Sequence, residues 1–251
     1  MTDRISMLIT GASGGIGRAA AIECARRGAR IGVHYNGNRE RAEATLAALS
    51  GDGHQLFQCD ITNPEAAEQL IEKVERAFDG LDALVNNAGI SQRHQFEDID
   101  YATWQETWQR IVNTNLTAAS NLCFCAGQKM IARGGGRIVN VSSRGAFRGE
   151  PLMPWYGASK AGMNAMGQSL AQALGPKGVF VYTVAPGFVE TEMAAAVLAS
   201  PEGDSIRNQS TIGRVAQPEE LGQTIAFLAL EAPAFMTGCI VDVNGASYLR
   251  S

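Results

Sequence analysis

The feature that most constrains the fold of this chain is a regular alternation of short buried strands with helices. Apolar runs end at glycine or polar residues, and segments with helical spacing follow them along the 251 residues. Alternation of this kind favours a parallel sheet with helices on both faces. The predicted strands are 5–10, 30–35, 55–59, 81–85, 136–141, 179–184 and 240–243. We therefore expect one doubly wound α/β domain over residues 1–251 with a seven-stranded parallel sheet.

A glycine-rich turn follows the first predicted strand and precedes a predicted helix over residues 18–27. Gly11 permits the turn, Gly15 lets a pyrophosphate approach the backbone, and Gly17 lets the helix pack closely on the strand. A strand, a glycine turn and a helix in this order present backbone N–H groups to a phosphate. The spacing Gly-x3-Gly-x-Gly differs from the best-known dinucleotide fingerprint, but its position indicates a Rossmann fold that binds a dinucleotide.

Polar and glycine residues stand where the first four predicted strands end. They are Gly11, Tyr35, Asp60 and Asn87. In doubly wound sheets the ligand lies beyond the carboxyl ends of the strands. The sequence therefore places the binding site at this edge.

Tyr156 and Lys160 are four residues apart in a segment predicted to be helical as far as residue 174, so they share one face. A free phenol has a pKa near ~10 and is a poor proton donor or acceptor at neutral pH. An adjacent ammonium favours the phenolate, and a decrease of roughly three pKa units corresponds to about 4 kcal/mol. We expect Tyr156 to act as a general acid or base. Taken alone, the pair could also be a half-exposed tyrosine beside a solvated lysine.

Together these residues resemble the short-chain dehydrogenase/reductase family over essentially the entire chain. The motifs that carry the resemblance are Thr10-Gly11-x3-Gly15-Ile16-Gly17, Asp60-Ile61-Thr62, Asn86-Asn87-Ala88-Gly89, Asn115, Ser143, Tyr156-x3-Lys160 and Pro186-Gly187-x3-Thr191. Ser143 precedes Tyr156 by thirteen residues, the interval usual in this family. The resemblance implies an enzyme that transfers hydride between NAD(P)(H) and a carbonyl or secondary alcohol.

The resemblance also implies the catalytic roles. Tyr156 would be the proton donor in reduction, and Lys160 would lower its pKa and bind the nicotinamide ribose. Ser143 would hydrogen-bond the carbonyl oxygen and stabilise its developing charge. Asn115 would interrupt its helix and hold a water that connects Lys160 to solvent. Ser142 competes with Ser143 for the hydroxyl role, and the interval to Tyr156 favours Ser143.

The implied cofactor contacts lie along several strand ends. Asp60 would bind the adenine amino group, and residues 87–89 would line the adenosine ribose. The segment 186–191 would hold the nicotinamide. The full set is Gly11, Ser13, Gly15, Ile16, Gly17, Tyr35, Asn36, Asp60, Ile61, Asn87, Ala88, Gly89, Tyr156, Lys160, Pro186, Gly187, Val189 and Thr191. The five scattered Cys and three isolated His predict no metal site.

The second predicted strand is followed by no carboxylate before Glu40, although enzymes that use NAD usually place one there for the ribose 2′-hydroxyl. Ser13, Asn36 and Arg39 could instead contact a 2′-phosphate. Position 14 is Gly14, where many relatives that prefer NADP carry Arg or Lys. We expect NADP(H) to be favoured over NAD(H).

Within the family the chain looks most like the 3-oxoacyl-carrier-protein reductases, a likeness carried by residues 136–140, 184–193 and 243–245. This predicts reduction of a 3-oxoacyl thioester. Acyl carrier protein is then a candidate partner, with Arg133 and Lys177 as docking residues beside the cleft.

Two alternatives remain at this point. Arg144 and Arg148 depart from that subgroup and could receive a carboxylate or phosphate, so the substrate could be a small polar alcohol such as a sugar, polyol or hydroxy acid. A second alternative is a scaffold that senses cofactor without catalysis, although such relatives usually lose part of the set Asn115, Ser143, Tyr156 and Lys160.

Residues 193–214 have weak periodicity and a Ser-Pro-Glu-Gly-Asp break, which predicts a mobile substrate flap. By resemblance the chain is a homotetramer, with helices 101–130 and 154–174 pairing across one interface and the last strand completing another.

The net charge of −4 gives no support for binding nucleic acid or an anionic membrane. No apolar run approaches ~18 residues, and the amino terminus lacks the apolar core of a signal peptide. We expect a cytoplasmic protein.

Overall fold

One parallel sheet organises the computed structural model, which describes residues 4–250. Residues 1–3 and residue 251 lie outside the described residues. The prediction that the amino terminus lacks a signal peptide falls partly on these residues. The strands run in the order β3-β2-β1-β4-β5-β6-β7, and every pair is parallel. Their bounds are β1 Ser6–Ile9, β2 Arg30–Tyr35, β3 Gln55–Gln58, β4 Ala83–Asn86, β5 Gly136–Val141, β6 Val179–Pro186 and β7 Ile240–Val243. The predicted seven-stranded parallel sheet is confirmed.

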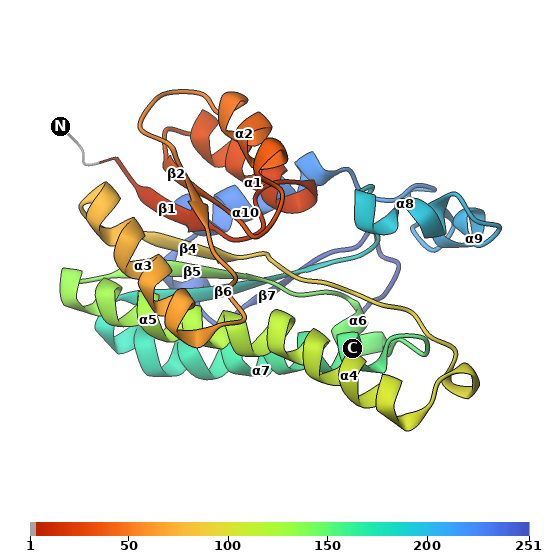
Figure 1. Cartoon of the computed structure of the whole chain (residues 1–251). Helices are drawn as coiled ribbons and strands as arrows, with labels where there is room; N and C mark the ends of the chain where they lie inside the picture. The colour runs from red at the N-terminus through yellow and green to blue at the C-terminus, as the bar shows by residue number, and fades with distance from the viewer. Residues whose placement is uncertain (1–3, 251) are drawn as a thin grey trace.

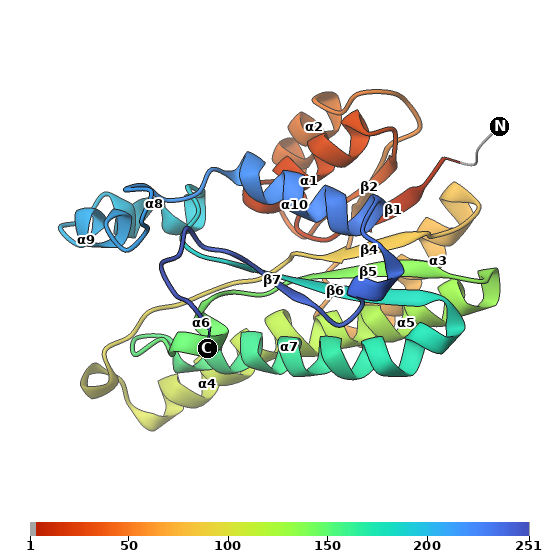
Figure 2. The same cartoon turned by 180° about the vertical axis from the view of Figure 1, so that it is seen from behind.

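Helices cover both faces of this sheet (Figures 1 and 2). On one face lie α1, α2 and α10, and on the other lie α3, α4, α5 and α7. The bounds of these helices are α1 Gly15–Arg26, α2 Arg39–Ala47, α3 Pro64–Phe78, α4 Tyr101–Val112, α5 Ala118–Arg133, α7 Pro154–Leu174 and α10 Pro218–Leu230. Each face has its own buried apolar cluster, so the sheet separates two cores in the manner of a doubly wound fold.

The strand order reverses between β1 and β4, where Ile9 pairs with Val85. Chain connections leave the two strands toward opposite sides of this point, which opens a crevice at the carboxyl ends of the strands. The glycine turn follows β1 and residues 87–89 follow β4, so both motifs border the crevice.

Two regions contain short helices that the sequence did not predict, and one predicted long helix is interrupted. The helix predicted over 101–130 is divided by a π-helical segment, η2 Asn113–Thr117. The loop predicted before Tyr156 contains α6 Gly145–Arg148, and the predicted flap contains α8 Glu192–Leu198 and α9 Gly203–Arg207. Helices this short do not fill the window of 11–18 residues from which helical periodicity is read.

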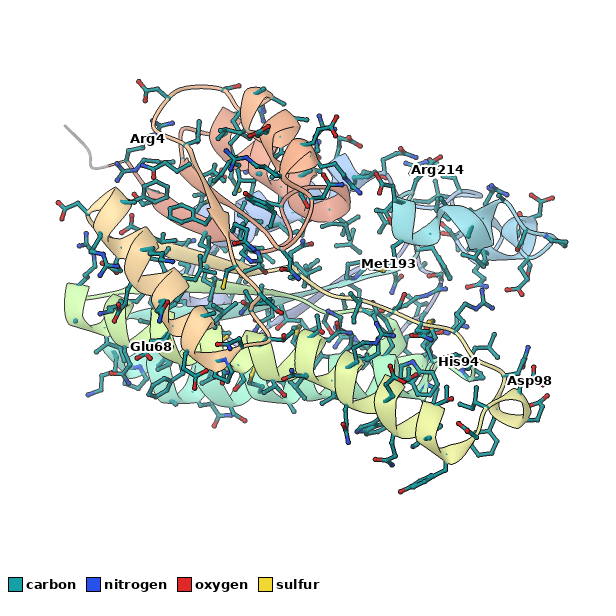
Figure 3. All side chains as sticks on the ribbon, viewed as in Figure 1. Arg4, Glu68, His94, Asp98, Met193 and Arg214 are labelled. Carbon is teal, nitrogen blue, oxygen red and sulfur yellow. The ribbon has the colours of Figure 1, made fainter. Side chains whose placement is uncertain are left out.

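The segment with α8 and α9 lies beyond the carboxyl ends of the strands (Figures 1 and 2). Its residue Met193 lies on the side of α8 that faces the segment carrying His94 (Figure 3). The remaining short turns are η1 Phe96–Asp98, η3 Gly175–Lys177 and η4 Ala234–Met236. Across the described chain, no helix combines the length and apolar character needed to cross a membrane.

Candidate active site

The turn after β1 is shaped by its glycines. Gly11 and Gly15 have φ angles of +64° and +52°, which favour glycine over other residues. A β-carbon at Gly17 would lie 2.5 Å from the carbonyl oxygen of Gly11, so only glycine allows this approach of helix to strand. Gly14 precedes α1 without a side-chain cap, which leaves N–H groups of the first turn of the helix without that partner. This arrangement fits the phosphates of a dinucleotide.

Side-chain hydrogen bonds fasten this turn to β4. The Asn87 amide donates to the Thr10 carbonyl at 2.8 Å and to the Gly11 carbonyl at 3.3 Å. The Thr10 hydroxyl accepts from the backbone N–H groups of Asn87 and Ala88, each at 3.0 Å. The Asn87 side chain therefore holds the turn in place, and its role in lining a ribose stays a prediction.

His34, which the sequence analysis did not single out, fastens the turn to β2 and β3. Its Nδ1 accepts from the Gly11 N–H at 3.1 Å, and its Nε2 lies 3.0 Å from the Cys59 carbonyl. Burial lowers the pKa of this histidine, which keeps the ring neutral with the proton on Nε2. A histidine inside an apolar strand has no local motif, so only the fold reveals its partner.

The other predicted adenosine contacts differ in accessibility. Asp60 is exposed, and its carboxylate accepts from the N–H and hydroxyl of Thr62, which lowers its pKa. Asn36 is also exposed. By contrast, Tyr35 and Ile61 are buried in the two cores, so their side chains pack rather than face a ligand. Only their backbone atoms remain available for the predicted contacts.

Asn115 lies in the π-helical segment η2, which confirms the expected interruption of the helix. The Asn115 side chain is fully buried. Its Oδ1 accepts from the Ile90 N–H at 2.8 Å. Its Nδ2 donates to the Ile90 carbonyl at 2.9 Å and to the Ser159 hydroxyl at 3.2 Å. This amide is therefore occupied by protein partners, and the role of Asn115 in holding a water stays a prediction.

Tyr156 and Lys160 share one face of α7, as their spacing predicts. The Lys160 Nζ lies 5.9 Å from the centre of the Tyr156 ring and donates to the Val141 carbonyl at 2.8 Å. Lys160 is only 3% exposed, and burial lowers its pKa to about 8. A β-carbon at Gly89 would lie 3.5 Å from this Nζ, so the lysine reaches the segment that follows β4.

The two candidate serines at the end of β5 have different roles. The Ser142 hydroxyl donates to the Lys160 carbonyl at 3.2 Å and is buried. The Ser143 Oγ accepts from the Gly145 N–H at 3.0 Å, and its hydrogen bonding acts on the pKa of the Tyr156 phenol. Ser143 is therefore the serine beside Tyr156, as the thirteen-residue interval predicts.

The pKa of Tyr156 contradicts one expectation from the sequence. Burial raises this pKa above its ordinary value, and the charge of Glu150 adds to the increase, while the hydrogen bond with Ser143 opposes it. The Lys160 ammonium lies over the ring and donates to the Val141 carbonyl. The phenol is thus held in its protonated form.

The segment after β6 closes the other side of the crevice. The methyl carbon of Thr191 would lie 3.3 Å from a β-carbon at Gly15, so this predicted nicotinamide segment reaches the glycine turn. Gly187 packs against Asn244, and the Val189 side chain is buried in the core. The structure therefore brings the ends of β1, β4, β5 and β6 and the start of α7 to one site.

Charged residues gather beside Ser143. Arg144 is 3% exposed, lies 5.2 Å from the centre of the Phe188 ring, and donates to the Gln209 side chain, which also accepts from Arg148 at 3.1 Å. Burial and the charge of Arg148 lower the pKa of Arg144 to about 10. Between residues 4 and 250, no carboxylate lies within ion-pair distance of Arg144, although Glu150 is close enough to influence it.

The predicted docking residues for a carrier protein are in the wrong place. Arg133 ends α5 immediately before β5, and Lys177 lies between α7 and β6. Both therefore lie at the amino ends of the strands, whereas the glycine turn and Tyr156 lie at the carboxyl ends. The helices run antiparallel to the strands, so residues at opposite ends of α7 lie at opposite edges of the sheet.

Comparisons with known proteins agree with this geometry. A family model described as enoyl-(acyl carrier protein) reductase matches residues 11–246. A 3-oxoacyl-acyl-carrier-protein reductase, FabG, of Staphylococcus aureus is 33% identical over 97% of this chain and 98% of its own length. Acetoacetyl-CoA reductases of Rhizobium meliloti and Shinella zoogloeoides are 34% and 33% identical, each over 96% of this chain and 97% of their own length. The chain belongs to the short-chain dehydrogenase/reductase family and is an oxidoreductase that uses a nicotinamide cofactor.

Proposed function

We propose that this chain uses NADP(H) to reduce the 3-oxo group of an acyl thioester. The convergence of Ser143, Tyr156 and Lys160 next to Gly89, in the segment that packs on the glycine turn, carries this proposal. The names of the similar enzymes, 3-oxoacyl-acyl-carrier-protein reductase and acetoacetyl-CoA reductase, support the choice of a 3-oxoacyl substrate.

The cofactor would be held along the crevice. The uncapped start of α1 and Gly15 would bind the pyrophosphate, and Asp60 would bind the adenine amino group. Lys160 and the segment 186–191 would hold the nicotinamide end, because the Lys160 Nζ lies close to Gly89, which borders the crevice. The absence of a carboxylate between Tyr35 and Glu40 supports a preference for the 2′-phosphorylated cofactor.

The bound cofactor would supply a hydride to the carbonyl carbon of the substrate. Tyr156 would give its phenolic proton to the carbonyl oxygen, and its raised pKa keeps that proton in place before substrate arrives. Ser143 accepts a hydrogen bond from the Gly145 N–H and hydrogen-bonds the Tyr156 phenol, and its hydroxyl proton would turn to the carbonyl oxygen when substrate binds. The Lys160 ammonium would stabilise the phenolate that remains and would then help to return a proton to it.

A cofactor-oxidation assay tests this proposal. We expect NADPH, and NADH more slowly, to be oxidised in the presence of an acetoacetyl thioester. Sugars, polyols and hydroxy acids with NADP⁺ serve as the competing substrate panel. If the thioester is not reduced and a member of that panel is turned over, the substrate is a small polar alcohol and not a 3-oxoacyl thioester.

A small oxo or hydroxy acid is the second candidate substrate, and Arg144 favours it. A buried guanidinium without a carboxylate partner is costly, and an anionic ligand would relieve that cost. Arg144 lines a cavity of about 170 Å³ that Phe188, Ser210 and Asn244 also border. A substrate carboxylate in this cavity would lie next to Arg144, which directly follows Ser143 in the chain.

A matched pair of substrates separates the two candidates. Acetoacetate and its methyl ester differ in one charge, and Arg148→Gln removes one positive charge next to Gln209. If an anion is recognised here, the variant should raise KM for the acid by about 10-fold and leave the ester unchanged. Equal effects on acid and ester would reject recognition of the carboxylate.

We also propose that the chain forms a homotetramer. Strand β7 is at the edge of the sheet and is partly exposed, and Phe124 on α5 is 66% exposed. An unpaired sheet edge can pair with a strand of another copy, and Phe124 lies on the long helix that the resemblance places in the other interface. Light scattering of the purified chain should give four times its mass of 26.7 kDa.

A further inference from the structure

Glu150 lies in the loop between α6 and α7, six residues before Tyr156. Its backbone carbonyl accepts from the Met153 N–H at 2.9 Å, which turns the loop into the start of α7. The same loop is joined to the segment that follows β4, because the His94 N–H donates to the Leu152 carbonyl at 3.0 Å. These two hydrogen bonds fix the backbone that carries Glu150 at the edge of the candidate active site.

The carboxylate of Glu150 packs on the backbone of Gly145. A β-carbon built on Gly145 would lie 2.7 Å from the Glu150 Oε1, so the absence of a side chain at this position leaves room for the carboxylate. The Gly145 N–H also donates to the Ser143 Oγ at 3.0 Å. The charge of Glu150 acts on the Tyr156 phenol as well, where it raises the pKa. Glu150 is therefore a neighbour of both groups that would contact the substrate carbonyl.

Among the residues that the structure describes, the Glu150 carboxylate has no hydrogen-bonding partner. Three arginines are near enough for their charges to act on its pKa, namely Arg93, Arg144 and Arg148. From residue 4 to residue 250, no arginine nitrogen lies within 4.0 Å of a Glu150 oxygen. These arginines donate instead to the side chains of Glu202 and Gln209. Glu150 is half-buried, and its burial raises its pKa, so this acceptor has lost part of its water without gaining a protein partner.

We propose that Glu150 determines substrate specificity by accepting a hydrogen bond from a donor group on the substrate. This inference rests on the proposed reduction of a carbonyl at Ser143 and Tyr156. An ionised carboxylate only accepts hydrogen bonds, so the group that it recognises must carry an N–H or an O–H. A hydrogen bond to a charged acceptor is also about twice as strong as one between neutral groups. The two candidate substrate classes both offer a donor, the amide N–H in the arm of an acyl thioester and the hydroxyl of a polyol.

Two pairs of substrates test the proposal, and the members of each pair differ only by a methyl group in place of the donor hydrogen. The first pair is the acetoacetyl thioesters of N-acetylcysteamine and of N-acetyl-N-methylcysteamine. The second pair is hydroxyacetone and methoxyacetone. Within each pair, the ratio of kcat/KM for the donor compound to that for the methylated compound measures recognition of the donor, because the reacting carbonyl is the same.

Glu150→Leu removes the acceptor with little change in volume. We expect it to lower this ratio by about 10-fold or more in at least one pair and to leave cofactor affinity unchanged. Glu150→Gln keeps an acceptor oxygen but loses the charge, so the ratio should fall by only about 3-fold in the same pair. Glu68→Leu is the matched control, because Glu68 is exposed on α3 and lies far from His94 (Figure 3). It should leave both ratios unchanged.

The pair in which the ratio falls identifies the donor as a thioester amide or as a hydroxyl. Ratios in Glu150→Leu and Glu150→Gln that equal those of the native chain in both pairs would overturn the assignment of Glu150. An equal decrease in Glu68→Leu would also overturn it, since the effect would then not come from the active site. If the native chain reduces none of the four compounds, the proposed carbonyl reduction is wrong, and not the assignment of Glu150 alone.

Discussion

The two sides of the active site are held together in different ways. On the cofactor side, the turn after β1 is fixed by neutral groups that have partners, namely Thr10, His34 and Asn87. On the substrate side, Arg144 and Arg148 share a single neutral acceptor, Gln209. The cofactor side is therefore complete before ligand binds, whereas the substrate side keeps desolvated charge that a ligand could balance.

This difference separates cofactor recognition, which all members of the family share, from substrate selection, which differs from one member to another. Backbone shape and neutral hydrogen bonds recognise a dinucleotide in the same way whatever the substrate is. Charged side chains on short helices and loops can change without altering that framework. We therefore expect changes on the cofactor side to affect all substrates equally, and changes on the substrate side to affect selectivity.

The largest effect is expected at Lys160, which lies between the two sides. Lys160→Met keeps the length of the side chain but removes the charge beside Tyr156 and the donor to the Val141 carbonyl. Turnover should fall by about 10²- to 10⁴-fold, with weaker cofactor binding. Steady-state kinetics and fluorescence titration measure the two effects. Lys177→Met, at the opposite edge of the sheet, is the control and should change neither.

A smaller effect is expected at Asn87, on the cofactor side alone. Asn87→Ala leaves the Thr10 and Gly11 carbonyls without this donor, so the free energy of unfolding should fall by about 1–3 kcal/mol. Cofactor affinity should decrease by about 10-fold, equally with every substrate. Asn63→Ala removes only the cap of α3 and should lower stability by about 1 kcal/mol without changing cofactor affinity. Equal cofactor affinities in the two variants would show that Asn87 does not hold the turn.

The smallest effect is a dependence of stability on pH through His34. The folded chain lowers the pKa of His34 below its ordinary value near ~6.5, so the unfolded chain takes up the proton first as pH falls. Stability from this group is therefore fully present above about pH 6.5 and decreases below it, by up to about 1.4 kcal/mol per pH unit. Thermal unfolding of His34→Gln between about pH 5 and 7 should show a shallower dependence than the native chain. The same slope in both chains would assign the effect to other groups.

The sequence predicts the cofactor side well because its motifs describe backbone geometry. Gly11, Gly15 and Gly17 are required by local conformation and close packing, and strand alternation places them at the edge where β1 and β4 separate. Partners far apart in the chain carry no such signal. The contact of His34 with Gly11 and that of Arg41 with Gly14 appear only when β2 and α2 fold back onto the turn.

The substrate side is predicted less well, and the errors have physical causes. The resemblance predicts Arg133 and Lys177 beside the cleft, but α5 and α7 carry them to the amino edge of the sheet. The nearby charge predicts a lowered pKa for Tyr156, yet burial of the phenol raises this pKa. The sequence spacing establishes that Tyr156 and Lys160 are neighbours but gives no measure of how far water is excluded from them.

The rate of hydride transfer in Tyr156→Phe tests the proposed mechanism most directly. It should be measured in a single turnover from bound NADPH to an acetoacetyl thioester, with cofactor affinity determined on the same sample. We predict a loss of about 10³-fold or more in rate with unchanged cofactor affinity, because only the proton donor is removed. Hydride transfer at a rate close to that of the native chain would contradict the assignment of Tyr156 as the proton donor.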